Sequence, residues 1–153
     1  FKDLSGIIQT IPFKADGTAV VAPTAPVFGR VVRTVGDITT TSTSLVDITG
    51  ATVTFTTGAF PVSVGCALTA VNGVTGGNNY YSIDIDAALE LGTSGMAFRH
   101  VVGELENDSF SHQTAALTAA SHTIKMQWKV STDTGTITAG AATAFSFWAH
   151  EIR

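Results

Sequence analysis

Four histidines and several carboxylates are the residues that could perform chemistry, and their spacing limits what that chemistry could be. No two of His100, His112, His122 and His150 stand at HxH or HxxxH spacing, and no cysteine lies near any of them. A zinc site would therefore have to be assembled from distant segments. His122 shares its parity with apolar residues, which favours a core histidine whose hydrogen bonds are satisfied. We expect no metal centre at the histidines.

Asp84 and Asp86 are expected on one face of one strand, about 7 Å apart by strand geometry. They could bind Ca²⁺ together with carbonyl oxygens of 72–79, or act as a general acid and base. Alternating carboxylates on a wet face more often have a structural role or are solvated. The carboxylates at 104, 106 and 108 are interpreted as a solvated turn. Cys66 stands in an apolar run and is expected to be a small buried residue.

Motifs that would indicate an enzyme are absent from the sequence. There is no GxSxG, no Walker A motif, and no kinase or dinucleotide-binding fingerprint. The glycine-rich segment 72–79, NGVTGGNN, lacks the Lys, the Ser and the helix that a phosphate cradle requires. We therefore predict a protein that is not an enzyme, with no catalytic residue and no cofactor.

Composition narrows the possible partners. The 153 residues fit one domain, and only 13% are charged, against about 25% in typical globular proteins. The net charge is −4 without a Lys/Arg cluster, so nucleic acid is not an expected partner. No apolar run reaches the ~18–20 residues of a membrane span. The single cysteine cannot form a disulfide within the chain. Low charge indicates a surface that is partly covered by other copies of the chain.

The elements that would position these residues are strands. Residues 121–131, SHTIKMQWKVS, alternate apolar and polar side chains with a period of two, and no segment sustains a helical period. About eight to ten such segments follow one another at strand spacing, separated by turn residues. The pattern predicts an all-β, jelly-roll-like antiparallel β-sandwich. The expected strands are 27–35, 44–48, 51–57, 62–71, 80–91, 96–105, 109–117, 121–131, 136–138 and 143–153.

Residues 1–26 differ from the rest of the chain. Pro12, Pro23 and Pro26 interrupt any long periodic element, while apolar residues such as Ile11 and Phe13 recur between them. We expect an extended N-terminal arm over 1–26 and a β-sandwich domain over 27–153. The arm packs either on its own domain or on a neighbouring subunit or larger assembly.

The closing segment, TAFSFWAHEIR, indicates an assembly surface. Phe145 and Phe147 can face the core, which turns Trp148, His150 and Ile152 outward. An outward Trp and Ile are costly to expose, at about 1.5–3 kcal/mol each. Either the N-terminal arm covers them, or they form a subunit interface, which we favour. The candidate interface residues are Ile11, Phe13, Trp148, His150 and Ile152.

Three stretches carry a resemblance to a known group of proteins. Residues 39–58 (TTTSTSLVDITGATVTFTTG), 117–140 (LTAASHTIKMQWKVSTDTGTITAG) and the closing HEI at 150–152 resemble the β-sandwich domains of tailed-phage virion proteins. These domains occur in tail fibres, head fibres and capsid decoration proteins. The strand arrangement is also similar to the trimeric jelly rolls of the tumour-necrosis-factor and complement-head class. The resemblance implies a virion surface role and a trimer, and carries over no catalytic residue. We therefore expect a homotrimeric virion protein that residues 1–26 anchor to capsid or tail proteins.

A carbohydrate-binding module is the alternative function. It requires Trp128, Trp148 or the pair Tyr80 and Tyr81 in an exposed row, with Asp84 and Asp86 holding a metal. Trp128 falls on the core parity, which counts against this function. A host surface glycan stays open as a partner of the virion protein as well.

Overall fold

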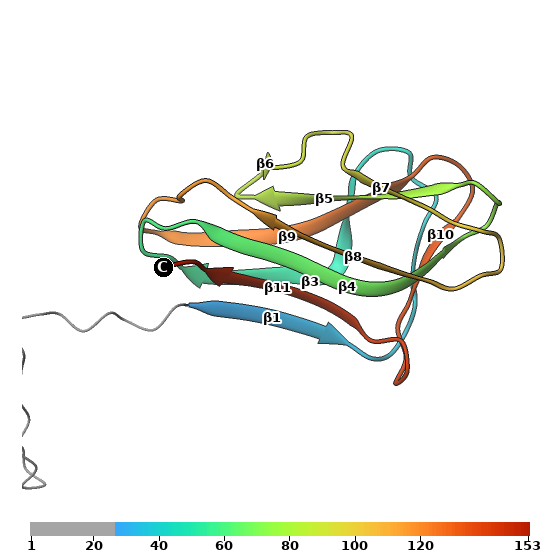
Figure 1. Cartoon of the computed structure of the whole chain (residues 1–153), viewed down its shortest axis with the longest axis horizontal. Helices are drawn as coiled ribbons and strands as arrows, with labels where there is room; N and C mark the ends of the chain where they lie inside the picture. Colours follow the sequence, from blue (N-terminus) through green and yellow to red (C-terminus); the bar gives the residue numbers. More distant parts are fainter. Residues whose placement is uncertain (1–26) are drawn as a thin grey trace, which may run out of the picture.

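The computed structural model describes residues 27–153 as a two-layered, all-β sandwich (Figure 1). The predictions for Ile11, Phe13 and the arm over 1–26 lie outside the described residues. The strands are β1 (Phe28–Arg33), β2 (Ile38–Thr40), β3 (Val46–Thr56), β4 (Val62–Asn72), β5 (Asn78–Ile85), β6 (Ala88–Leu89), β7 (Met96–Arg99), β8 (Glu106–Gln113), β9 (Ser121–Val130), β10 (Gly135–Thr138) and β11 (Phe145–Glu151).

The strand pairing is that of a jelly roll. In the first sheet the order is β1, β11, β4, β8. The strand β11 pairs with the N-terminal part of β4, β10 pairs with its C-terminal part, and β2 pairs with β10. In the second sheet the order is β3, β9, β5, with β6 and β7 both pairing the outer edge of β5. Every pair is antiparallel, and strands consecutive in sequence mostly change sheet. This arrangement is the double Greek key of a jelly roll and confirms the predicted fold class.

The core lies between the two sheets and is centred on β9. Ile124, Met126, Trp128 and Val130 are each at most 1% exposed, which confirms that β9 is an inner strand with one buried face. The Trp128 and Tyr81 rings are nearly parallel, with centroids 6.5 Å apart. Such packed aromatic pairs add to the stability that area burial alone gives. Phe145 and Phe147 are buried opposite, as their parity predicted.

Two strand boundaries were predicted wrongly, for local reasons. Thr49-Gly50 does not turn the chain. It lies within β3, where the pairing to β9 shifts register and Gly50 has a φ of 82°, a β-bulge rather than a turn. The expected strand 80–91 ends at Ile85 in a two-residue hairpin through Asp86 and Ala87, which have φ values of 51° and 70°.

The other strand corrections concern the short elements. The expected strand 96–105 ends at Arg99, and β8 begins at Glu106, where a turn was expected. The short β2, Ile38–Thr40, was not predicted. It is only three residues long and becomes a strand because β10 pairs with it.

Candidate assembly interface

The two outer faces of the sandwich carry different chemistry. On the second sheet, charged and polar side chains pair with one another. Lys125 Nζ lies 2.9 Å from Asp47 Oδ2, and Gln127 Nε2 donates to Asp47 Oδ1 at 2.7 Å. Lys129 stands over the ring of Tyr80, 5.2 Å from its centroid. The hydrogen bonds and the charge of Lys125 lower the pKa of the Asp47 carboxyl. This is a solvated face.

The outer face of the first sheet is nearly uncharged, and we call it the small-residue face. The strand register places Arg30 beside Trp148, Trp148 beside Gly65, and Gly65 beside Ser111 in one row. Arg30 is the one permanent charge among its residues, and its Nε donates to Ser146 Oγ at 3.1 Å. The small-residue face consists of Phe28, Arg30, Val32, Ser63, Gly65, Ala67, Ser109, Ser111, Gln113, Ser146, Trp148 and His150.

Trp148 lies against the backbone of β4 because position 65 has no side chain. A Cβ at Gly65 would stand 2.6 Å from Trp148 Cζ2 and 3.0 Å from the Phe110 carbonyl oxygen. Beside the indole, Phe28 is 59% and Val32 is 50% exposed. A shallow hollow of about 440 Å³ opens there, between Trp148, Phe28 and Ala67. The face therefore carries a partly exposed Trp148 beside a shallow hollow.

The structure brings two of the predicted interface residues together on this face. Trp148 and His150 are adjacent outward positions of β11 and are partly exposed. Ile152 follows the strand, is partly exposed, and its N–H donates to the Pro61 carbonyl oxygen at 2.8 Å. The strand β4 is apolar on both parities, yet residues 27–153 cover only one of its faces fully. The interface role of these residues stays a prediction.

Sequence reasoning missed a buried carboxylate that fixes the end of β11. Glu151 is 1% exposed, and its Oε1 accepts a hydrogen bond from the Gly58 N–H at 2.5 Å. Its Oε2 lies 2.7 Å from Arg153 Nη2. Burial by itself raises the pKa of Glu151, but the Gly58 and Arg153 contacts outweigh burial, and the pKa is lowered. A Glu on the core parity of a strand was the available signal.

The prediction that Asp84 and Asp86 share the wet face of one strand is wrong, because β5 ends at Ile85 and the hairpin turn places Asp86 beyond the strand. Asp84 is 8% exposed, and its Oδ1 accepts the Ala87 N–H at 3.1 Å, within the turn. Asp86 lies beyond the strand, and its carboxylate reaches β9 instead. The structural role that the sequence favoured is what the contacts show.

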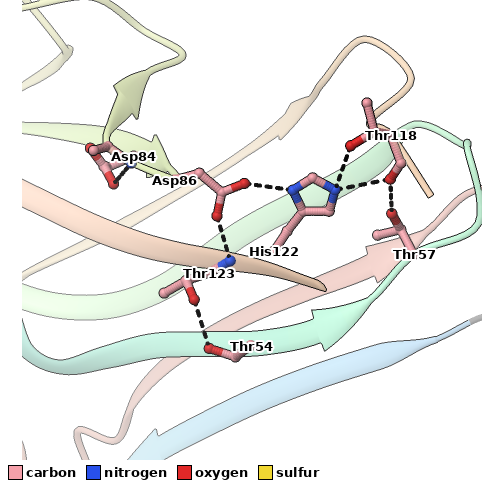
Figure 2. Close-up of polar contacts among 8 residues, drawn as sticks. Thr54, Thr57, Asp84, Asp86, Thr118, His122 and Thr123 are labelled. Carbon is pink, nitrogen blue, oxygen red and sulfur yellow. Dashed lines mark hydrogen bonds and ion pairs between the residues drawn. The ribbon is translucent and has the colours of Figure 1, made fainter. Parts of the chain in front are cut away.

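Figure 2 shows where Asp86 goes: the His122 ring lies between Asp86 and Thr118. Nδ1 is 2.6 Å from Asp86 Oδ2, and Nε2 is 2.9 Å from the Thr118 carbonyl oxygen. Both acceptors favour the imidazolium, so the Thr118 and Asp86 contacts raise the pKa of His122. The Thr123 N–H and His122 lower the pKa of Asp86. His122 is 7% exposed and satisfied, as predicted.

A second buried polar cluster joins residues far apart in sequence. The Tyr81 hydroxyl donates to Asp108 Oδ2 at 2.9 Å, and His100 Nε2 lies 3.2 Å from the same oxygen. Asp108 is 3% exposed, so its interpretation as part of a solvated turn is wrong. Burial raises the pKa of Asp108. Tyr81 and His100 are both fully buried, which leaves the cluster without access for a substrate.

Other reactive groups in residues 27–153 are similarly placed. Cys66 is fully buried, as predicted, and burial raises the pKa of its thiol to about 12. Within this range no three His, Cys, Asp or Glu side chains come together as a metal site. No helix in the described part of the chain is long and apolar enough to cross a membrane.

No protein-family model and no curated protein matches the chain. Among solved structures, the chain is similar to a mutant VP2 protein of infectious bursal disease virus in derived T=1 particles. The identity is 11%, the match covers 94% of this chain and 40% of that chain, and the TM-score is 0.52. The chain thus spans less than half of that VP2, and the likeness shows the fold alone.

Two further structures are similar at lower TM-scores. One is the VP2 subviral particle of the same virus, 13% identical, with 94% of this chain and 41% of that chain covered and a TM-score of 0.49. The other is dimeric latent PorU from Porphyromonas gingivalis, 10% identical, with 92% and 14% covered and a TM-score of 0.45.

Proposed function

We propose that the chain is a non-enzymatic structural protein of a virus particle, displayed on the particle surface as a homotrimer. The trimer forms through the small-residue face, and residues 1–26 anchor it to other virion proteins. Capsid decoration, head fibre and tail fibre are the roles of this kind, and a tailed phage is the source that the sequence resemblance supports. The observation that carries the proposal is the contrast in charge between the two outer faces of the sandwich.

The charge contrast favours association because a face without charges is inexpensive to dehydrate. Burying an unpaired charge costs several kcal/mol, whereas apolar groups are favourable to bury and a hydroxyl needs only one hydrogen-bond partner across the interface. Arg30 already donates a hydrogen bond to Ser146, which lessens the cost of burying it. Trp148 and Phe28 supply aromatic anchors, and truncating such an anchor commonly costs about 2 kcal/mol or more.

The particle role is supported by the fold and by the sequence resemblance together. The jelly-roll order of strands is similar to VP2 from T=1 particles of infectious bursal disease virus. The stretches 39–58 and 117–140, which resemble phage virion domains, contain β3 and β9, two neighbouring strands of the second sheet, together with β10 and most of β2. A carbohydrate-binding module requires a row of exposed aromatic side chains, and two of the candidates for that row are buried: Trp128 is 1% and Tyr81 is 0% exposed.

The trimer is tested by sedimentation equilibrium of the full chain at about 10 μM, with Ala67→Arg and Thr56→Arg as a matched pair. Both positions are exposed strand residues, on the small-residue face and on the opposite face. We expect a trimer for the wild type and for Thr56→Arg, and a monomer for Ala67→Arg. A wild-type monomer, or an Ala67→Arg trimer, would refute the proposed interface.

The particle role is tested by immunogold electron microscopy. Antibody raised against residues 27–153 should label the outside of intact particles of the virus that encodes the chain. Particles that bind no antibody, although the protein is present in the infected lysate, would refute display on the particle surface. This outcome is independent of the oligomeric state.

A further inference from the structure

The solvated face of the second sheet contains a second hollow, distinct from the small-residue face. It has a volume of about 400 Å³ and lies between the loop before β3, the segment from β6 to β7, and the outer side of β9. We call it the loop groove. Its polar residues are Thr43, Ser44, Thr93, Ser94, Gln127 and Lys129. Ligand pockets in proteins commonly span about 300–1,000 Å³, so the volume suits a small ligand.

The groove offers many hydrogen-bonding groups that the described part of the chain leaves unused. No hydrogen bond from the side-chain hydroxyls of Thr43, Ser44, Thr93 or Ser94 to another residue of 27–153 is formed. Each hydroxyl can both donate and accept. Lys129 Nζ donates one hydrogen bond, to the Thr93 carbonyl oxygen at 2.8 Å, and stands over the Tyr80 ring, so two of its N–H groups have no hydrogen-bond acceptor among residues 27–153.

The charge of the groove favours an anion, although the chain as a whole has a net charge of −4. None of the residues that line the groove is acidic, and Lys129 is the single cation among them. The nearest carboxylate partner of Gln127 is Asp47, whose two oxygens are occupied by Gln127 and Lys125. One ammonium in a ring of hydroxyls matches a ligand with one carboxylate and many neutral polar groups.

Apolar surface completes the lining. Leu45 and Leu89 are both partly buried and contribute methyl groups to the groove. A sugar ring presents C–H groups on one side and hydroxyls around its edge, which fits this mixture. A phosphate ligand would instead call for clustered cations or a helix N-terminus, and the groove has one cation and no helix.

We propose that the loop groove binds a saccharide that carries a carboxylate, with Lys129 as the carboxylate partner. The hydroxyls of the loop before β3 and of the segment before β7 then hold the sugar hydroxyls, and Leu45 and Leu89 lie against the ring. The site faces away from the proposed trimer interface, so each copy in a trimer presents one groove.

The test is a ligand-observed NMR titration of the full chain with 3′-sialyllactose and with lactose, which lacks the carboxylate-bearing sugar. We expect saturable binding of sialyllactose with a Kd of about 1 mM, and binding of lactose at least about tenfold weaker. Lys129→Gln should weaken sialyllactose binding at least about tenfold, because it removes a charge-assisted hydrogen bond. Arg33→Gln, an equal loss of charge on the other sheet, should leave the affinity unchanged.

A variant that fills the groove provides the second readout. Ser94 is exposed, so Ser94→Trp should fold normally and abolish sialyllactose binding. Equal affinity for lactose and sialyllactose, no saturable binding at 20-fold excess over about 1 mM, or full affinity in Lys129→Gln or Ser94→Trp would each overturn the proposal. A wild-type monomer in sedimentation would refute the trimer and leave the groove unaffected.

Discussion

Replacing Tyr81 with Phe removes one oxygen from the buried cluster and leaves the aromatic packing in place. The lost hydroxyl donates to Asp108 Oδ2 at 2.9 Å, in a site where Asp108 is 3% exposed. A hydrogen bond to a charged group contributes about 1.5–3 kcal/mol, and the carboxylate that loses this donor is almost fully buried. His100 stays 3.2 Å from the same oxygen, so we expect a loss of about 2 kcal/mol.

Urea unfolding at pH 7, at one fixed protein concentration, measures this loss. With an m-value of about 2 kcal/mol/M, the midpoint of Tyr81→Phe should fall by about 1 M at unchanged m. Tyr80→Phe is the matched control, since its hydroxyl is partly exposed and lies 3.5 Å from Asn78 Nδ2. The control should change stability by less than about 0.5 kcal/mol.

A double-mutant cycle with Asp108→Asn separates the hydrogen bond from other effects of the substitution. The coupling energy between positions 81 and 108 should be about 1–2 kcal/mol. If Tyr81→Phe unfolds at the wild-type midpoint, or if the coupling is zero, then the buried hydroxyl–carboxylate bond does not stabilise the fold, and the reasoning fails.

Three further predictions concern other contacts. His122 has a raised pKa and Asp86 a lowered one, so their contribution is full between pH ~4 and ~6.5 and is lost as pH rises through the folded pKa of His122 or falls through that of Asp86. The Tm difference between wild type and His122→Gln should therefore be largest near pH 5.5 and shrink by pH 9; a constant difference would contradict the linkage. Gly65→Ala should lift Trp148 off β4 and shift its fluorescence to longer wavelength, because the new Cβ would stand 2.6 Å from the ring; an unchanged spectrum would contradict the contact. Cys66, with a thiol pKa of about 12 and no exposure, should react with a thiol reagent at pH 8 only after denaturation, and rapid labelling of the native protein would contradict its burial.

Most of the fold could be predicted from the alternation of apolar and polar residues. It located β9 and assigned its core face, because a strand with one wet side leaves a period of two in the sequence. The bulge at Gly50 and the hairpin at Asp86 and Ala87 were missed for a shared reason. At each place the local residues are compatible with more than one backbone path, and pairing with the neighbouring strand selects the one with the observed positive φ values.

The sites depend on contacts that periodicity does not encode. Outward placement of Trp148 and His150 followed from parity, whereas the small-residue face needs the register of four strands that are distant in sequence. The cluster of Tyr81, His100 and Asp108 could not be predicted. A polar residue on the core face of a strand indicates that it has a hydrogen-bond partner, but the sequence does not indicate which residue that partner is.

The contact between Gly65 and Trp148 also constrains how the sequence can evolve. Positions 65 and 148 lie side by side on adjacent strands, and the indole ring of Trp148 fills the space that a side chain at position 65 would occupy. Neither position can change freely while the other is kept. In proteins descended from a common ancestor with this chain, a side chain at 65 should appear together with a smaller residue at 148, and this covariation can be read from sequences without a structure.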